Sequence, residues 1–343
     1  MISKKRKLRS SPKNTVAVLG NGGWGTTLAL VLAGKGLPVS LWGVSPEYMR
    51  DMAKSRENKK FLPGFQLPKN ISLTSDLFEA LTDSRIVVLA SPSQYMRSVL
   101  KKVRAEDYSK KSFVSVAKGI EVSTLKVMSE VITEELGPVR LGVLSGPSIA
   151  REVAMKMPVA VSAASRDVDF AAEIRELFAT DYFNLFESHD VLGVELGGSI
   201  KNVIAISAGI VEGLGFGTNT RAALFARGTA EMARLGEAMG ANRQTFMGLS
   251  GLGDLATTCL SRESRNRTLG EAIGRGKKLK AILGKTEMVV EGVDTSKSAY
   301  ELSKKYKVSM PIVEAVYRIL FENKNPKEAI KALMHSGFHK ELD

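Results

Sequence analysis

The sequence predicts two domains of different class, an α/β domain built on a doubly wound, mostly parallel sheet and then an all-α domain. The chain has 343 residues, 44% of them hydrophobic, which is more than one compact domain usually holds. Its first half alternates short apolar runs with amphipathic stretches, which is typical of strands buried on both faces by crossover helices. After His189 the periodicity is helical, with many Ala, Leu, Glu and Lys residues.

The predicted elements follow in a regular order. An apolar run at 15–19 (TVAVL) predicts the first strand, and a Gly-rich turn separates it from a helix at 26–33. A second strand is expected at 38–42 (PVSLW). Further strands are expected at 86–89, 113–116, 141–144 and 159–162, and the last one at 182–186. We therefore divide the chain into a basic tail at 1–13, a sheet domain at 14–190 and a helical domain at 191–343.

The tail carries much of the positive charge. Six lysines and arginines before residue 14 contribute to a net charge of +13. Such a tail is most often solvated, and binding to nucleic acid or anionic lipid is the lesser alternative. No helix-turn-helix or RNA-binding aromatic pattern supports nucleic-acid recognition. A positive body would also attract phosphorylated, anionic substrates.

Composition points to a cytoplasmic protein without a metal site. No apolar run approaches the roughly 18–20 residues of a membrane span, and no signal core follows the basic tail. The single cysteine, Cys259, excludes an intrachain disulfide framework and a zinc cluster, and it is expected to pack as a small hydrophobe. His189, His335 and His339 lack the spacing of zinc ligands.

A glycine motif predicts a dinucleotide site. Residues 20–25 (GNGGWG) match G-x-G-x-x-G directly after the first strand and at the start of the first helix. Gly20 permits the tight turn, Gly22 lets the backbone approach a pyrophosphate, and Gly25 lets helix and strand pack closely. The fold class is therefore a Rossmann domain followed by a helical domain, and the cofactor is NAD or NADP.

The choice between the two dinucleotides stays open. An acidic residue that binds the ribose of NAD is expected where the second strand ends. That end is Trp42–Pro46 (WGVSP), with neither an acidic residue nor an arginine. Glu47 and Arg50 are expected on the exposed face of the following helix.

Five segments in order carry a family resemblance. They are FLPG at 61–64, AKGIE at 117–121, SGPSIAREV at 145–153, KNVIA at 201–205 and LSGLGDLATTC at 249–259 with SRNR at 264–267. Together they resemble bacterial NAD(P)-dependent glycerol-3-phosphate dehydrogenases over nearly all of the chain after the tail. The resemblance implies a homodimer that reversibly reduces dihydroxyacetone phosphate to sn-glycerol 3-phosphate, a precursor of phospholipids. The family often has a basic residue where Val44 and Ser45 stand, which weakens the case for NADP.

The resemblance also implies roles for individual residues. Negative charge grows on the ketone oxygen as hydride arrives, so a positioned proton donor is most valuable in the transition state. Lys201 is implied as general acid and base, Lys118 as the neighbouring cation that lowers its pKa, and Asp254 as the group that orients Lys201. The implied substrate contacts are Lys118, Gly146, Ser148, Lys201, Asn202, Asp254, Thr258, Ser264, Arg265 and Asn266. The implied cofactor contacts are Gly20, Gly22, Gly23, Trp24, Gly25, Val44, Tyr95, Lys118, Ala150, Arg265, Val289 and Glu291.

Each role has a structural alternative. Lys118 and Lys201 could be surface lysines, and Asp254 could be a plain helix N-cap. Arg267 is best interpreted as part of a solvated face. At the level of function, the alternatives are another two-domain dehydrogenase, acting on a 3-hydroxy acid, a 2-ketoacid or an acyl thioester, and a dinucleotide sensor or nucleic-acid binder without catalysis.

Overall fold

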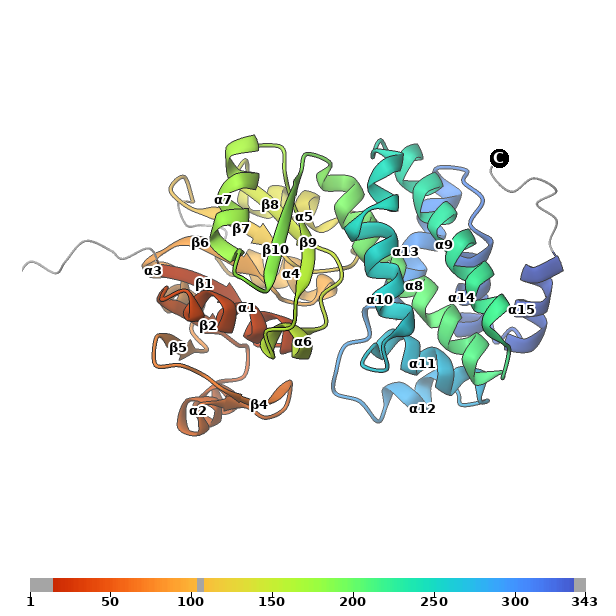
Figure 1. The fold of residues 1–343 in the computed structure, drawn as a ribbon, viewed down its shortest axis with the longest axis horizontal. Coiled ribbons are helices and arrows are strands. Elements are labelled where there is room, and N and C mark those ends of the chain that lie inside the picture. Colours follow the sequence, from red (N-terminus) through yellow and green to blue (C-terminus); the bar gives the residue numbers. More distant parts are fainter. Residues whose placement is uncertain (1–14, 104–107, 336–343) are drawn as a thin grey trace, which may run out of the picture.

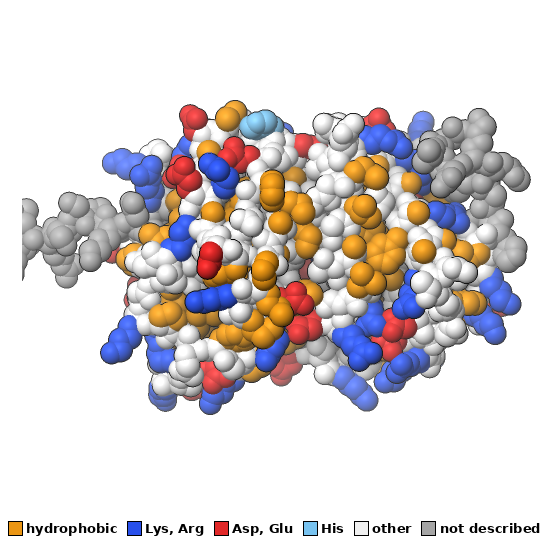
Figure 2. All heavy atoms as spheres, in the orientation of Figure 1, with side chains coloured by type: hydrophobic (Ala, Val, Ile, Leu, Met, Phe, Trp, Pro, Cys, Tyr) orange, Lys and Arg blue, Asp and Glu red, His pale blue; other side chains and the backbone are white. Residues whose placement is uncertain are grey.

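The protein consists of a sheet-containing part and a helical part that lie side by side (Figure 1). A computed structural model describes residues 15–103 and 108–335. The basic tail at 1–13 and His339 lie outside the described residues. Figure 2 shows basic side chains scattered over the face in view, interspersed with acidic ones.

An eight-stranded sheet forms the centre of the first part. Its spatial order is β10-β9-β8-β7-β6-β1-β2-β5, and every neighbouring pair is parallel except β8 with β9. The strands are β1 (Thr15–Leu19), β2 (Val39–Trp42), β5 (Ile71–Thr74), β6 (Ser84–Leu89), β7 (Ser112–Ser115), β8 (Arg140–Ser145), β9 (Val159–Ser165) and β10 (Phe183–Ser188). The predicted fold class, a mostly parallel sheet followed by helices, is confirmed.

Helices cover both faces of this sheet, and alternate residues of β1 belong to different cores. Val16 and Val18 pack with α1 (Gly23–Gly34), α2 (Pro46–Ser55) and α7 (Val168–Phe178). Ala17 and Leu19 pack on the other face with α3 (Leu77–Thr82), α4 (Ser93–Lys101) and α5 (Met128–Leu136). This double burial explains why the strand is a continuous apolar run rather than an alternating one.

Some details of the sheet differ from the expectation. The edge strand β5 and the small hairpin of β3 (Glu57–Asn58) and β4 (Leu62–Gln66) were not predicted. These segments are short and partly polar, so their pattern resembles that of loops. Phe186, the last residue of the strand predicted at 182–186, is 58% exposed, because it alternates along the edge strand β10 with the buried Phe183 and Leu185.

The second part contains only helical elements among the described residues. They are α8 (Val191–Gly213), α9 (Thr218–Ala238), a 3-10 turn (Arg243–Met247), a π-helical turn (Leu249–Gly253), α10 (Asp254–Leu260), α11 (Arg265–Gly274), α12 (Leu279–Leu283), α13 (Glu291–Lys305), α14 (Pro311–Phe321) and α15 (Pro326–His335). α8 is buried along nearly all of its length, and its apolar side chains form the centre of the largest hydrophobic cluster.

The same helix is the only described one long and apolar enough to cross a membrane. Its apolar window lies entirely inside the fold, as expected for the core helix of a bundle. Burial on all sides also explains why any polar side chain on α8 needs a partner within the protein.

Candidate active site

The glycine motif lies at the point where the sheet changes direction. β1 pairs with β2 on one side and with β6 on the other. The chain therefore leaves β1 toward one half of the sheet and later crosses to the other half, and the turn after Leu19 lies at this switch point. Ligands of doubly wound sheets bind in the crevice that such a switch point creates. The turn leads directly into α1, whose first N–H groups have no acceptor within the helix.

The geometry of this turn matches the work expected of each glycine. Gly20 has a φ of 134°, and a Cβ there would lie 2.6 Å from the backbone of Ala90 at the end of β6. A Cβ on Gly25 would lie 2.0 Å from the carbonyl oxygen of Gly20. A Cβ on Gly22 would meet nothing within 4 Å, so open space lies beside the first turn of α1. The residues present therefore fit a dinucleotide phosphate.

A buried asparagine supports the turn, and sequence reasoning missed it. Asn58 is fully buried, and its amide donates to the carbonyl oxygen of Asn21 at 2.8 Å and to Thr26 Oγ1 at 2.7 Å. Its oxygen accepts from the Tyr48 hydroxyl at 2.6 Å. Asn58 lies three positions before Phe61, the first residue of the FLPG segment, and a polar residue beside a family motif was the available signal.

The contrast between two glycines gives a prediction. We expect Gly25→Ala to distort the turn and to lower Tm by several degrees, because overpacking of this kind costs roughly 1–3 kcal/mol. Gly22→Ala should leave Tm unchanged but weaken dinucleotide binding at least tenfold, because its methyl group would occupy the space beside the helix terminus. Thermal unfolding without ligand and fluorescence titration with NADH test both statements. Equal Tm values for the two variants would contradict this account of the turn.

Two lysines and an aspartate meet between the two parts of the molecule. One carboxylate oxygen of Asp254 accepts a hydrogen bond from Lys118 Nζ at 2.6 Å, and the other accepts one from Lys201 Nζ at 2.8 Å. The Asp254 side chain is 2% exposed and the Lys201 side chain 8%. Lys201 also donates to Thr258 Oγ1 at 2.5 Å, and that hydroxyl donates to the carbonyl oxygen of Asp254 at 2.7 Å. Two cations therefore share one buried carboxylate.

Three separate segments bring these residues together. Lys201 lies in the middle of the buried helix α8, and Asp254 is the first residue of α10, directly after the π-helical turn. Lys118 comes from the loop that follows β7, and it also donates to the carbonyl oxygen of Gly146 at 3.0 Å. Asp254 therefore acts as an ion-pair partner rather than as a plain N-cap, and neither lysine is a surface lysine.

Lys118 has a strongly lowered pKa. Burial lowers its pKa to about 8, and the positive charge of Lys201 acts in the same direction, whereas Asp254 opposes both. The sequence interpretation assigned the lowered pKa to Lys201, with Lys118 as the cause. The structure shows a lowered pKa for Lys118. An amine with a pKa near neutrality can exchange a proton at physiological pH.

The Ser-Gly-Pro-Ser segment borders the same cluster. Gly146, with a φ of 144°, follows β8, and its carbonyl oxygen accepts from both Lys118 and the Ser148 hydroxyl. Ser145, the last residue of β8, has a buried hydroxyl without a partner among the described residues. A Cβ on Gly198 of α8 would lie 2.4 Å from that hydroxyl, so β8 and α8 are in close contact here.

Asn202, which follows Lys201 on α8, contacts Asn266 of α11. Asn266 Nδ2 donates to Asn202 Oδ1 at 2.9 Å, and Asn266 Oδ1 accepts from the N–H of Gly292 at 3.0 Å. Both asparagines are buried, so they join α8, α11 and α13. Ser264 caps α11 by accepting from the Arg267 N–H at 3.2 Å. Arg265 is the first residue of α11.

The interpretation of Arg267 as a solvated residue is wrong. Arg267 is only 7% exposed, and its guanidinium forms an ion pair with Glu212 of α8 at 2.5 Å. The pattern of Ser-Arg-Asn-Arg alone does not reveal this, because the partner lies in a distant helix. By contrast, Arg265 is exposed and donates to the carbonyl oxygen of Val289 at 2.7 Å.

The other expected cofactor residues surround the glycine turn to different degrees. Ala150 accepts from the Thr27 hydroxyl through its carbonyl oxygen at 3.0 Å, so it lies against α1, and a Cβ on Gly23 would approach it. Val44 and Tyr95 are exposed, at 71% and 57%. The Trp24 ring packs edge-on against that of Phe183, with ring centroids 6.3 Å apart.

Glu291 joins the helical part to the sheet part. Its carboxylate accepts from the backbone N–H of Ser93 at 3.1 Å and from the Ser93 hydroxyl at 2.5 Å. Burial raises the pKa of this carboxyl.

Glu47 and Arg50 lie exposed on α2, as predicted, and Ser45 caps that helix. No group of three or more potential metal-ligating His, Cys, Asp or Glu side chains occurs within 15–103 and 108–335. Cys259 is buried, which raises its pKa to about 12.

Known proteins resemble the chain over nearly its whole length. Residues 15–171 match the N-terminal domain and residues 190–331 the C-terminal domain of the family described as NAD-dependent glycerol-3-phosphate dehydrogenase. The glycerol-3-phosphate dehydrogenase [NAD(P)+] of Citrifermentans bemidjiense is 51% identical over 322 residues, which are 93% of this chain and 96% of that protein.

Solved structures agree with this assignment. The crystal structure of glycerol-3-phosphate dehydrogenase from Coxiella burnetii has a TM-score of 0.92 at 36% identity, covering 95% of this chain and all of that one. The enzyme from Saccharomyces cerevisiae has a TM-score of 0.80 at 30% identity, covering 93% of this chain and 99% of that one. With both family domains matched and half of its residues shared with a relative, the chain belongs to the NAD(P)-dependent glycerol-3-phosphate dehydrogenase family.

Proposed function

We propose that this protein transfers hydride reversibly between NAD(P)H and dihydroxyacetone phosphate, giving sn-glycerol 3-phosphate for glycerophospholipid synthesis. The observation that carries the proposal is the buried cluster of Lys118, Asp254 and Lys201, in a chain of this family. Such a cluster holds protonated amines in a site of low polarity, where they interact strongly with a developing negative charge.

Residues 14–190 are proposed to hold the dinucleotide. Its phosphates would lie at the first turn of α1, against Gly22 and Gly23, with Ala150 and Glu291 on the neighbouring segments. The nicotinamide, when bound, supplies or accepts the hydride. The side chain of Val44 and the ring of Tyr95 are exposed and available to pack against the rest of the dinucleotide.

Residues 191–343 are proposed to supply the proton. Lys201 Nζ holds a proton that it donates to the ketone oxygen in reduction and recovers from the hydroxyl in oxidation. Asp254 and Thr258 fix this ammonium group from two directions, which leaves it little freedom to adopt unproductive orientations. Lys118 adds a second positive charge beside the same oxygen, and Gly146 and Ser148 border the space for the substrate hydroxyl.

The phosphate of the substrate is proposed to bind at the N-terminus of α11. Ser264, Arg265 and Asn266 occupy this terminus, and a helix N-terminus favours an anion. Arg265 uses one N–H for Val289, and its planar group has further donors for phosphate oxygens. The alternative substrates, which lack a phosphomonoester, would leave these donors without a partner.

A parallel assay tests the proposal. The purified protein is mixed with dihydroxyacetone phosphate, and the loss of NADH and of NADPH absorbance is followed separately. Turnover with either nucleotide supports the reaction and ranks the cofactors. A folded protein that binds dinucleotide but shows no turnover would overturn the substrate assignment in favour of another dehydrogenase or a sensor.

The assembly and the cellular location stay predictions. A homodimer is expected by resemblance, and a cytoplasmic location is expected from composition. Light scattering coupled to size exclusion tests the first, and fractionation of the source cells tests the second.

A further inference from the structure

The loop that carries Lys118 is held both by its own hydrogen bonds and by side chains of neighbouring helices. Residues 116–127 join β7 to α5. Within them, the Glu121 N–H donates to the carbonyl oxygen of Lys126 and the Leu125 N–H to that of Glu121, both at 2.9 Å, beside an isolated bridge between Ile120 and Val127. Leu125 has a φ of 61°, which is uncommon for a non-glycine residue. Residues 120–127 thus form a closed turn, and its placement relative to the rest of the molecule depends on side chains of neighbouring elements.

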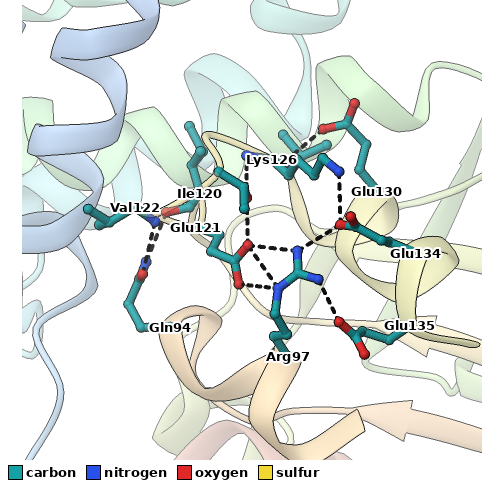
Figure 3. Close-up of polar contacts among 11 residues, drawn as sticks. Gln94, Arg97, Ile120, Glu121, Val122, Lys126, Glu130, Glu134 and Glu135 are labelled. Atoms are coloured by element: carbon teal, nitrogen blue, oxygen red, sulfur yellow. Dashed lines mark hydrogen bonds and ion pairs between the residues drawn. The ribbon is translucent and has the colours of Figure 1, made fainter. Parts of the chain in front are cut away.

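Two side chains of α4 hold its middle (Figure 3). Gln94 Nε2 donates to the carbonyl oxygen of Ile120 at 2.8 Å, and Gln94 Oε1 accepts from the N–H of Val122 at 3.0 Å. One turn further along α4, Arg97 donates through Nε and Nη2 to the two carboxylate oxygens of Glu121, both at 2.8 Å. One helix thus contacts both the backbone on either side of Glu121 and the Glu121 side chain, which also accepts from the Thr124 hydroxyl at 2.5 Å.

Arg97 also joins the loop to the following helix. Its Nη1 donates to Glu135 at 2.6 Å, and its Nη2 to Glu134 at 2.8 Å, both on α5. Lys126 forms an ion pair with Glu134 at 2.8 Å. Two cations therefore face three carboxylates, and the Glu121 and Glu135 side chains are each only 6% exposed. Removal of Arg97 would leave Lys126 alone to balance all three.

Hydrogen bonds within the network lower the pKa values of two of its carboxyl groups. The hydrogen bond from Arg97 lowers the pKa of Glu121, and the hydrogen bonds from Lys126 and Arg97 lower the pKa of Glu134 to about 2. Both shifts favour the ionised forms of Glu121 and Glu134, which attract the Arg97 guanidinium. A bidentate arginine has the planar geometry for this contact, which lysine lacks.

The loop is tightly packed on the side of Lys118. A Cβ on Gly119 would lie 2.2 Å from Ser93 Oγ, so residue 119 is in close contact with the start of α4. Ser298 of α13 donates to the carbonyl oxygen of Ile120 at 3.0 Å. A shift of Glu121 would therefore move the neighbouring backbone, and with it the amine that lies 2.6 Å from Asp254.

We propose that Arg97 is a positioning residue for the reaction, which acts by fixing Glu121 and thereby the backbone from which Lys118 reaches the active site. This inference rests on the proposed function. Misplacement of a reacting group by about 1 Å can cost on the order of 100-fold in rate. The effect of Arg97 on catalysis should therefore pass through Lys118.

The experiment compares Arg97→Met with Arg97→Lys, Glu121→Gln and the control Arg85→Met. Arg85 is a largely exposed arginine 4.0 Å from Glu173. We expect Arg97→Met to lower kcat/KM for dihydroxyacetone phosphate roughly 10- to 100-fold while the Kd for NADH changes less than threefold. Arg97→Lys should lose less, and the control nothing. Hydrogen exchange should accelerate in 116–127 of Arg97→Met but not of the control.

A double-mutant cycle separates positioning from general damage. In a Lys118→Ala background, Arg97→Met should cause no further loss of kcat/KM. The proposal would be overturned if the double variant lost kcat/KM by the product of the two single losses. It would also be overturned if kcat/KM were unchanged in both Arg97→Met and Glu121→Gln. If Arg97→Met fails to fold, Glu121→Gln carries the same cycle, because it preserves the shape of the side chain. Failure of the proposed function is distinguishable, since the unmodified protein would then show no turnover.

Discussion

Lys201→Ala lowers kcat for the reduction of dihydroxyacetone phosphate by on the order of 10²–10⁴-fold, the usual contribution of a general acid. The loss is expected in kcat and kcat/KM together, because the proton donor acts in the transition state. Stopped-flow and steady-state assays with NADH or NADPH, whichever the protein uses, measure it.

The stability of this variant should move in the opposite direction from its activity. The cluster contains two cations and one carboxylate, so removal of Lys201 leaves Lys118 and Asp254 as a balanced pair. We expect an unchanged or higher Tm and an unchanged Kd for the dinucleotide. The matched control is Lys327→Ala, at an exposed position. A loss of activity below tenfold, or one accompanied by unfolding, would contradict the role of Lys201 as proton donor.

Asp254→Asn removes the only carboxylate between the two lysines, and both activity and stability should fall. Breaking a buried ion pair while its charged partner stays buried costs roughly 3–5 kcal/mol. The same change should reduce kcat by on the order of 100-fold or more, because Lys201 loses the group that orients it. Thermal unfolding and the reduction assay test the variant, with Asp169→Asn at an exposed position of α7 as control.

The pH dependence of this variant has a defined sign. Asp254 raises the pKa of Lys118, whereas burial and Lys201 lower it, so without the carboxylate that pKa should fall below about 8. In the variant Lys118 loses its destabilising charge at a lower pH than in the unmodified protein. The stability deficit should therefore be largest near pH 6 and shrink as the pH rises toward 8. A deficit that grows over this interval would contradict the assignment.

Sequence reasoning found the parts of the molecule that depend on local pattern. Continuous apolar runs such as 15–19 identified buried parallel strands, and the glycine spacing at 20–25 identified the switch point. The cluster of Lys118, Lys201 and Asp254 was reached only through resemblance, because these residues lie far apart in sequence. The structure brings them within hydrogen-bonding distance.

The remaining features depend on tertiary contacts that no local pattern encodes. Arg267 is as polar as any surface arginine until Glu212 of α8 is placed beside it. Asn58 supports the glycine turn across a separation of more than 30 residues. The short edge strand β5 was missed because its pairing with β2, rather than its own composition, makes it a strand.

The excess positive charge of the buried cluster would link the binding of an anion to the docking of the two domains. Lys118 belongs to the sheet part, whereas Lys201 and Asp254 belong to the helical part, so the surplus cation exists only where the two meet. An anion bound beside the cluster would neutralise its net positive charge. It would thereby stabilise the contact between the two domains. Substrate charge would then supply adhesion as well as recognition, and the protein would be most firmly assembled when it is occupied.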